Sequence, residues 1–224
     1  MTPKGESGDG NSGGNGVDPL LSELERDALT EVINIGVSRA AKNLSRMVKD
    51  QVHLSVPRTE FMTRDRAVGW LSKRENSSLV AVGQDFRGSF SGQALLIFPE
   101  KTSLELVRSI LDGTLSLEEI VDLEQEALAE IGNVVLNGCL VVMANMLKRS
   151  LDMSLPRVMR GSSQVVLLGA QEEDPGEMVL FLTIDFAVRS RSINGYIALL
   201  MDLPSITAIK TLIREYLKGF EESR

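Results

Sequence analysis

The sequence predicts an α+β fold in which two related halves share one continuous, mainly antiparallel sheet with helices packed on it. Three observations support this prediction. Apolar residues recur at helical spacing from Leu20 to about Val48, strand-like alternation follows, and the same order of elements then starts again. The chain has 224 residues, of which 43% are hydrophobic, and this is enough to bury one large core or two small ones.

The N-terminus is expected to stay outside this fold. Residues 1–18 are rich in Gly, Ser and Asn and have almost no large apolar side chain, so burial cannot repay the entropy of ordering them. No apolar core follows a basic start, which disfavours a secretory signal. We expect a tail over 1–18 and a folded domain over 19–224.

The first half is expected to form a helix, three strands and a closing helix. In the first helix Leu29, Val32 and Gly36 share the side that faces the core, and Asp18 or Ser22 can serve as the N-cap. The strands and the closing helix are read from alternation and helical spacing, with the first strand ending at a proline. They are expected at 52–56, 79–82, 94–98 and 102–111.

The second half repeats the first. Residues 126–158 align with residues 27–59 without a gap at an offset of 99, and nine of the 33 positions are identical. The identical pairs include Glu31/Glu130, Asn34/Asn133, Ser55/Ser154, Pro57/Pro156 and Arg58/Arg157. Three short strands alone would make a marginal sheet, so we expect the repeats, about 19–113 and 114–222, to pair about a pseudo-twofold axis.

One polar helix face in the first repeat is a candidate functional surface. Asp27, Glu31 and Asn34 lie at i, i+4 and i+7, within a stripe about 60° wide, and Ser38 extends it. A solvated helix face is normally polar, so this pattern alone carries little weight. Asn is a mediocre helix former, however, and an Asn retained in mid-helix suggests a use for its amide.

The second repeat carries the same polar face, and the recurrence is what gives it weight. Its members are Glu126, Glu130, Asn133 and Asn137. In both repeats the Asn is followed, after 22 intervening residues, by a proline. Random substitution on a surface without a function would not usually preserve the same spacing in both repeats.

Composition excludes several other functions. The net charge is −7, and no cluster of Lys or Arg is large enough to follow a nucleic-acid backbone. The single cysteine, Cys139, is expected to be a buried structural thiol, and with the single histidine, His53, no Cys/His metal site is possible. No uninterrupted apolar run approaches the roughly 20 residues that span a bilayer, so a cytoplasmic protein without membrane insertion is expected.

The motif resembles a known signature. The spacing Asp27-x3-Glu31-x2-Asn34-x22-Pro57 resembles that of the CheC/CheX/FliY family of bacterial chemotaxis phosphatases. The second copy departs from the family pattern at its first position, Glu126, where the family usually has Asp or Ser. Two motifs in one chain look more like CheC than the one-motif CheX. FliY carries an additional flagellar-switch domain, whereas only a closing helix is expected here after Met201.

The resemblance implies a phosphatase that acts on the aspartyl-phosphate of a CheY-type response regulator. Mg²⁺ would belong to that regulator, so no cofactor is expected on this chain. Asn34 and Asn133 would orient the attacking water, and Glu31 and Glu130 would pair with a lysine of the regulator. The remaining motif residues are expected to bind the partner, namely Asp27, Glu126, Ser38 and Asn137, or to have a structural role near strand ends, namely Pro57 and Pro156.

Two alternatives remain at the level of sequence. The polar faces could belong to a non-enzymatic scaffold or binding module of the flagellar switch or the chemotaxis pathway, which binds a response regulator or CheD. Binding of CheD, a receptor deamidase, is implied only by the resemblance. A glycosidase-like pair of Asp27 and Glu31 is disfavoured, because one Trp and two Tyr offer little surface for stacking on sugars.

Overall fold

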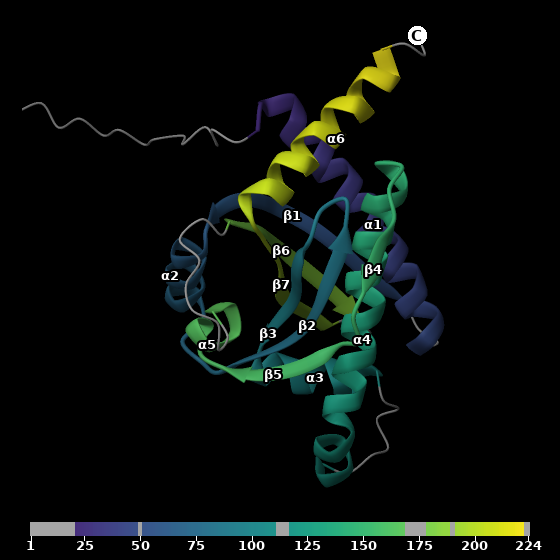
Figure 1. Cartoon of the computed structure of the whole chain (residues 1–224). Helices are drawn as coiled ribbons and strands as arrows, with labels where there is room; N and C mark the ends of the chain where they lie inside the picture. The colour runs from purple at the N-terminus through teal and green to yellow at the C-terminus, as the bar shows by residue number, and fades with distance from the viewer. Residues whose placement is uncertain (1–20, 49–50, 111–116, 169–177, 189–190, 222–224) are drawn as a thin grey trace, which may run out of the picture.

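The computed structural model describes residues 21–48, 51–110, 117–168, 178–188 and 191–221 (Figure 1). The predicted tail over 1–18 and the predicted junction between the repeats at 113–114 lie outside the described residues. The described residues form six helices and seven strands. In chain order they are α1 (Glu23–Val48), β1 (Val52–Thr63), α2 (Arg64–Arg74), β2 (Leu79–Gly88), β3 (Gly92–Pro99), α3 (Glu100–Ile110), α4 (Leu117–Met146), β4 (Leu151–Met153), β5 (Arg157–Gly161), α5 (Ser163–Leu168), β6 (Met178–Val188), β7 (Arg191–Met201) and α6 (Leu203–Glu221).

All seven strands belong to one sheet. Its order is β1-β6-β7-β3-β2, and β4 and β5 both pair with the outer side of β2. Each of these strand pairings is antiparallel. The predicted α+β class with one continuous sheet is therefore confirmed.

The sheet has an internal pseudo-twofold symmetry. In the second half, β4 and β5 together take the place that β1 has in the first half, while β6 and β7 correspond to β2 and β3. Exchanging the halves about an axis between β3 and β7 therefore reproduces the strand order. As a result β1 pairs with β6 of the other half, and β4 and β5 pair with β2 of the other half. Each half thus completes the sheet of its partner.

Two details differ from the sequence prediction. The short helices α2 and α5, which follow the first strand of each half, were not predicted. The first strand does not end at Pro57 but continues to Thr63, with a shift in its pairing to β6 between Ser55 and Arg58. A proline is tolerated there because β1 is an edge strand and the pairing is already irregular. In the second half the strand does break, and Pro156 lies between β4 and β5.

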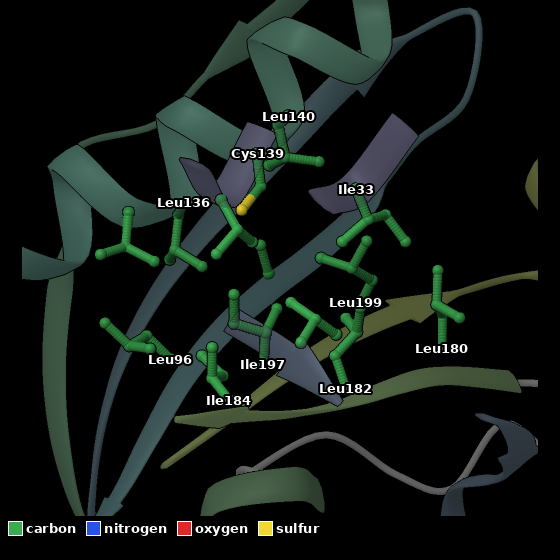
Figure 2. Close-up of a cluster of buried hydrophobic side chains, with 14 of the residues drawn as sticks. Ile33, Leu96, Leu136, Cys139, Leu140, Leu180, Leu182, Ile184, Ile197 and Leu199 are labelled. Carbon is green, nitrogen blue, oxygen red and sulfur yellow. The ribbon is translucent and has the colours of Figure 1, made fainter. Parts of the chain in front are cut away.

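The sheet separates two apolar cores. Strand residues alternate between them, so that Val80 and Val82 face the larger core and Leu79 and Ala81 face the smaller one. Helices α1, α3, α4 and α6 cover the larger core, and α2 and α5 cover the smaller one. Figure 2 shows part of the larger core, with side chains of α1 and α4 pointing toward the sheet. Those it labels on the helices are Ile33, Leu136, Cys139 and Leu140.

Cys139 is fully enclosed in this core. Its side chain is buried, and burial raises the pKa of the thiol to about 12. A thiol held in this protonated form is a poor nucleophile and metal ligand. The interpretation of Cys139 as a structural residue is therefore supported.

Helices α1 and α4 approach each other closely at two glycines. A Cβ atom placed on Gly36 would lie 2.9 Å from the Cα atom of Cys139, and one placed on Gly138 would lie 2.7 Å from the Cβ atom of Ala40. Separations this short are below van der Waals contact. The absence of a side chain at Gly36 and Gly138 therefore sets how closely the helices of the two repeats can pack.

Helix α4 is apolar enough to be mistaken for a membrane span. By length and composition alone, its segment Leu123–Met146 could cross a bilayer, although Asn residues interrupt its apolar runs. In the fold, 56% of the tested window is buried inside the protein, against α1 and the sheet. This burial is typical of the core helix of a globular protein.

The start of α1 is fixed by a capping box and an ion pair. The Ser22 amide donates to Glu25 Oε2 at 2.7 Å, and the Glu25 amide donates to Ser22 Oγ at 3.3 Å. Arg214 of α6 also donates to the buried Glu25 carboxylate. Burial alone would raise the pKa of Glu25, but the Ser22 amide and Arg214 outweigh it and hold the pKa below its ordinary value of 4.5. Ser22 is thus the N-cap.

Replacing the close-packed glycine should destabilise the fold. We expect Gly36→Ala to lower the free energy of unfolding by more than about 1 kcal/mol, because the new methyl group meets backbone atoms of α4. Gly69→Ala in α2 is the matched control, since nothing lies within 4 Å of its added Cβ and alanine should stabilise that helix by up to about 1 kcal/mol. Urea unfolding measures both. Equal effects at the two positions would contradict the close helix contact.

Glu25→Gln should reveal a pH-dependent contribution to stability. The folded-state pKa is lowered, so the contribution is present above the unfolded pKa and is lost as pH falls through the folded pKa. We expect a loss of about 1 kcal/mol near neutral pH that shrinks in acid, measured by urea unfolding from about pH 7 to about pH 3. Glu23→Gln, at an exposed position in the same turn, is the control. A difference that is constant over this range would refute the role of the charge.

Candidate functional site

The first candidate face lies on the outer side of α1. Asp27, Glu31 and Ser38 are exposed and Asn34 is half-buried, whereas the core-facing residues of this helix are fully buried. The predicted orientation of the helix is therefore correct. Within the part of the chain that the structure describes, the Asn34 side chain has no hydrogen-bond partner. Its amide is free to turn either its oxygen or its nitrogen toward a ligand.

The second candidate face, on α4, has the same pattern but a different hydrogen-bond network. Glu126 and Glu130 are exposed, and Asn133 and Asn137 are half-buried. The Asn133 Oδ1 atom accepts hydrogen bonds from Asn137 Nδ2 at 2.6 Å and from Gln84 Nε2 at 3.1 Å. An amide oxygen has two lone pairs, so both acceptor positions of Asn133 are in use and only its NH₂ group is left for a ligand.

Gln84 reaches Asn133 because α4 packs tightly on β2. A Cβ atom on Gly132 would lie 2.3 Å from Val82 Cγ1, so the helix can rest on this strand only with glycine there. Gln84 follows Val82 two residues later on the same face of β2 and is buried, with 1% of its surface exposed. The sequence analysis missed Gln84. The available signal was a glutamine within an otherwise apolar stretch of strand, which the structure buries on both faces.

The proline of the second motif lies beside the polar face of α4. In the second half the break at Pro156 is held against β2, because the Asp85 amide donates to Ser154 Oγ and the Ser154 amide donates to Asp85 O, both at 2.9 Å. Arg157 pairs with the Asp85 carboxylate at 2.7 Å. An open hollow between α4 and this break is lined by Gln125, Glu126, Ala129, Pro156, Arg157 and Val158. The 22-residue spacing thus brings the proline next to the start of the polar face.

In the first half the corresponding contact belongs to the pairing of β1 with β6. Ser55, the counterpart of Ser154, is opposite Asp185 in the β1–β6 register, immediately before the shift at Pro57. The residue before the proline also differs: Val56 is buried, whereas Leu155 is 85% exposed beside the second site. The two sites are related by the repeat but are not equivalent.

The two helices that carry the polar faces contact strands near opposite edges of the sheet. Helix α1 contacts β1, and α4 contacts β2, β4 and β5. These strands lie toward the two opposite edges of the sheet, while α1 and α4 pack side by side on one of its faces (Figure 1). The protein therefore presents two separate sites rather than one composite site.

Neither site has the composition of a metal centre. Among the described residues, no group of three or more His, Cys, Asp or Glu side chains could hold a metal ion. What each site offers is an exposed carboxylate and, one turn further along the helix, a half-buried carboxamide. This arrangement can form an ion pair with a cationic partner group and place an amide beside it.

Comparison with known proteins finds two family models that each match a region containing one motif. The family model described as CheC-like matches residues 24–60, which contain the first motif, and the model described as chemotaxis phosphatase CheX matches residues 80–174, which contain the second. The chain therefore resembles the CheC, CheX and FliY proteins in sequence. The resemblance predicted from the Glu and Asn spacing is therefore confirmed.

Relatives with assigned names agree. The chain is 22% identical to the putative CheY-P phosphatase CheC1 of Halobacterium salinarum, over 83% of this chain and 92% of that protein. It is 26% identical to the flagellar motor switch phosphatase FliY of Bacillus subtilis, over 62% of this chain but only 36% of FliY. The match to a CheC protein thus spans nearly its whole length, whereas FliY extends well beyond the matched region.

Solved structures share the fold at low identity. FliY of Thermotoga maritima matches with a TM-score of 0.68 and 16% identity, over 88% of this chain and 98% of that one. FliM from the FliG–FliM complex of Helicobacter pylori matches with a TM-score of 0.61 and 14% identity, over 85% and 100%. The same architecture therefore occurs in a FliY protein and in a FliM protein crystallised with FliG, so the fold alone does not decide the function.

Proposed function

We propose that this protein is a cytoplasmic phosphatase that removes the phosphoryl group from the aspartyl-phosphate of a CheY-type response regulator, in bacterial chemotaxis or a related two-component pathway. The observation that carries the proposal is the repeated pairing of an exposed Glu with a half-buried Asn one turn later, once on α1 and once on α4. Relatives that match this chain are named CheY-P phosphatases, which supports the choice of substrate.

The Asn side chains are assigned the chemical role. Transfer of a phosphoryl group to water depends mainly on positioning and charge stabilisation, and a carboxamide can donate and accept hydrogen bonds without being a strong base. Asn34 and Asn133 are half-buried on otherwise exposed faces, so their amides are held near the surface at a defined depth. In a docked complex they would hold the attacking water, or a phosphoryl oxygen, in line for reaction.

The Glu side chains are assigned the docking role. Glu31 and Glu130 are exposed and would pair with a lysine beside the phospho-aspartate of the regulator. Asp27 and Glu126 lie one turn earlier on the same faces and add to the negative field. The Mg²⁺ ion required for aspartyl-phosphate chemistry would be contributed by the regulator. CheD remains a second possible partner, proposed only from the family resemblance.

A scaffold is the second candidate, because the fold is shared with FliM from a FliG–FliM complex. A scaffold needs the exposed carboxylates for binding but has no use for a half-buried carboxamide at the same place in both repeats. The Asn residues therefore separate the two functions.

Replacement of both Asn residues should abolish turnover. We expect the wild-type protein to accelerate loss of phosphate from a phosphorylated CheY-type regulator, and Asn34→Ala with Asn133→Ala to reduce this acceleration on the order of 100-fold while binding is largely kept. Phosphate release after labelling with a small phosphodonor measures the rate, and each single variant apportions activity between the sites.

Two exposed Asn residues on the same helices provide matched controls. Asn43 and Asn145 lie more than two turns beyond the motif Asn of α1 and α4, so Asn43→Ala and Asn145→Ala should keep the wild-type rate. Wild-type protein that binds a regulator without accelerating phosphate loss would reject the phosphatase and favour the scaffold.

A further inference from the structure

Gln84 occupies a position where packing alone would favour an apolar residue. It lies between Val82 and Phe86 in the row of β2 side chains that faces α4, and both neighbours belong to the larger core. The pseudo-symmetric strand β6 has Ile184 at the corresponding position, since Asp85-Phe86 corresponds to Asp185-Phe186. Ile184 is completely buried in the same core. The fold therefore accepts an aliphatic side chain at this place.

Among the described residues, only the nitrogen of the Gln84 side-chain amide has hydrogen-bond partners. Its Nε2 atom donates to Asn133 Oδ1 at 3.1 Å and to the Ser154 carbonyl oxygen at 3.0 Å. Both partners are acceptors here, so the nitrogen end of the amide must point toward the site. Among the described residues, its Oε1 atom is buried without a hydrogen-bond partner. An unmet buried acceptor lowers stability, which indicates that Gln84 serves a purpose other than packing.

The effect on Asn133 is to fix its orientation. With Asn137 and Gln84 both donating to Oδ1, the amide oxygen is held inward and the NH₂ group is the end available to a ligand. Such a donor is set before the partner arrives, and preorganised donors need no rearrangement at the moment of reaction. At the first site the corresponding position of β6 is Ile184, which cannot donate a hydrogen bond, and among the described residues no hydrogen bond fixes the Asn34 amide before a partner binds.

We propose that Gln84 is a positioning residue for the second site, which presents the Asn133 NH₂ group as a fixed hydrogen-bond donor to the phosphoryl oxygens or the attacking water, while the first site has no such support. This inference rests on the proposed phosphatase function. The two sites would then differ chemically. The Asn133 amide presents only its NH₂ group as a hydrogen-bond donor, whereas the Asn34 amide can donate or accept.

Gln84→Met tests the inference in the full-length Asn34→Ala protein, where only the second site works. Methionine has a similar length but cannot donate a hydrogen bond. We expect kcat for loss of phosphate to fall about 10-fold with KM changed less than about 2-fold, since docking through Glu130 is untouched. Gln164→Met, at an exposed position of α5, is the matched control and should change neither constant.

A measurement on the wild-type protein keeps the test independent of activity and of the folding of the variant. Side-chain ¹⁵N relaxation should show the Asn133 NH₂ group to be rigid and the Asn34 NH₂ group to be mobile, and Gln84→Met should make Asn133 mobile as well. Equal mobility of the two amides in the wild type, or an unchanged kcat in an active protein that carries Gln84→Met, would overturn the role of Gln84 and leave the phosphatase proposal intact. Wild-type protein without activity would instead reject the phosphatase, and with it the proposed use of the Asn133 donor.

Discussion

The exchange of outer strands between the two repeats is the constraint on which the rest of the structure depends. Because β1 completes the sheet beside β6, and β4 and β5 complete it beside β2, neither repeat has a full sheet of its own. The exchange also carries each motif proline to the edge of the sheet that the other repeat supplies. In the second repeat Pro156 lies beside the polar face of α4, so this site is built on strands of both repeats.

The same constraint explains the glycines of the helix pair. Helices α1 and α4 cover the same face of the shared sheet and pack side by side, and Gly36 and Gly138 let them do so at close range. The buried sides of the two helices form this contact and part of the larger core. The carboxylates and amides of both motifs therefore lie on the outer sides of the helices. Because the apolar side of each helix is buried, its polar side is the one available for function. The chemistry then depends on the few side chains at that face rather than on the architecture, which FliM shares.

Much of this could be predicted from the sequence, and the reason is periodicity. The repeat at an offset of 99, the helix faces of Glu31 and Glu130, and the single sheet all follow from local spacing and from self-similarity. Contacts between distant segments could not be predicted in this way. Gln84 meets Asn133 across 49 residues, and Pro57 lies inside a strand only because β6 tolerates a shift beside it. Helix α5 was missed because it has only 6 residues, and α2 was missed because Ala67 and Leu71 are its only buried apolar residues, which gives a weak helical periodicity.

The most direct test of two separate sites is the number of regulators that one chain can bind. A CheY-type regulator that carries Mg²⁺, and beryllium fluoride in place of its phosphoryl group, can be titrated against the protein. The stoichiometry of binding is then measured by sedimentation. Two regulators per chain are expected, with Glu31→Lys and Glu130→Lys each removing one of them. A single bound regulator that survives both charge reversals would contradict the assignment of the two helix faces as docking sites.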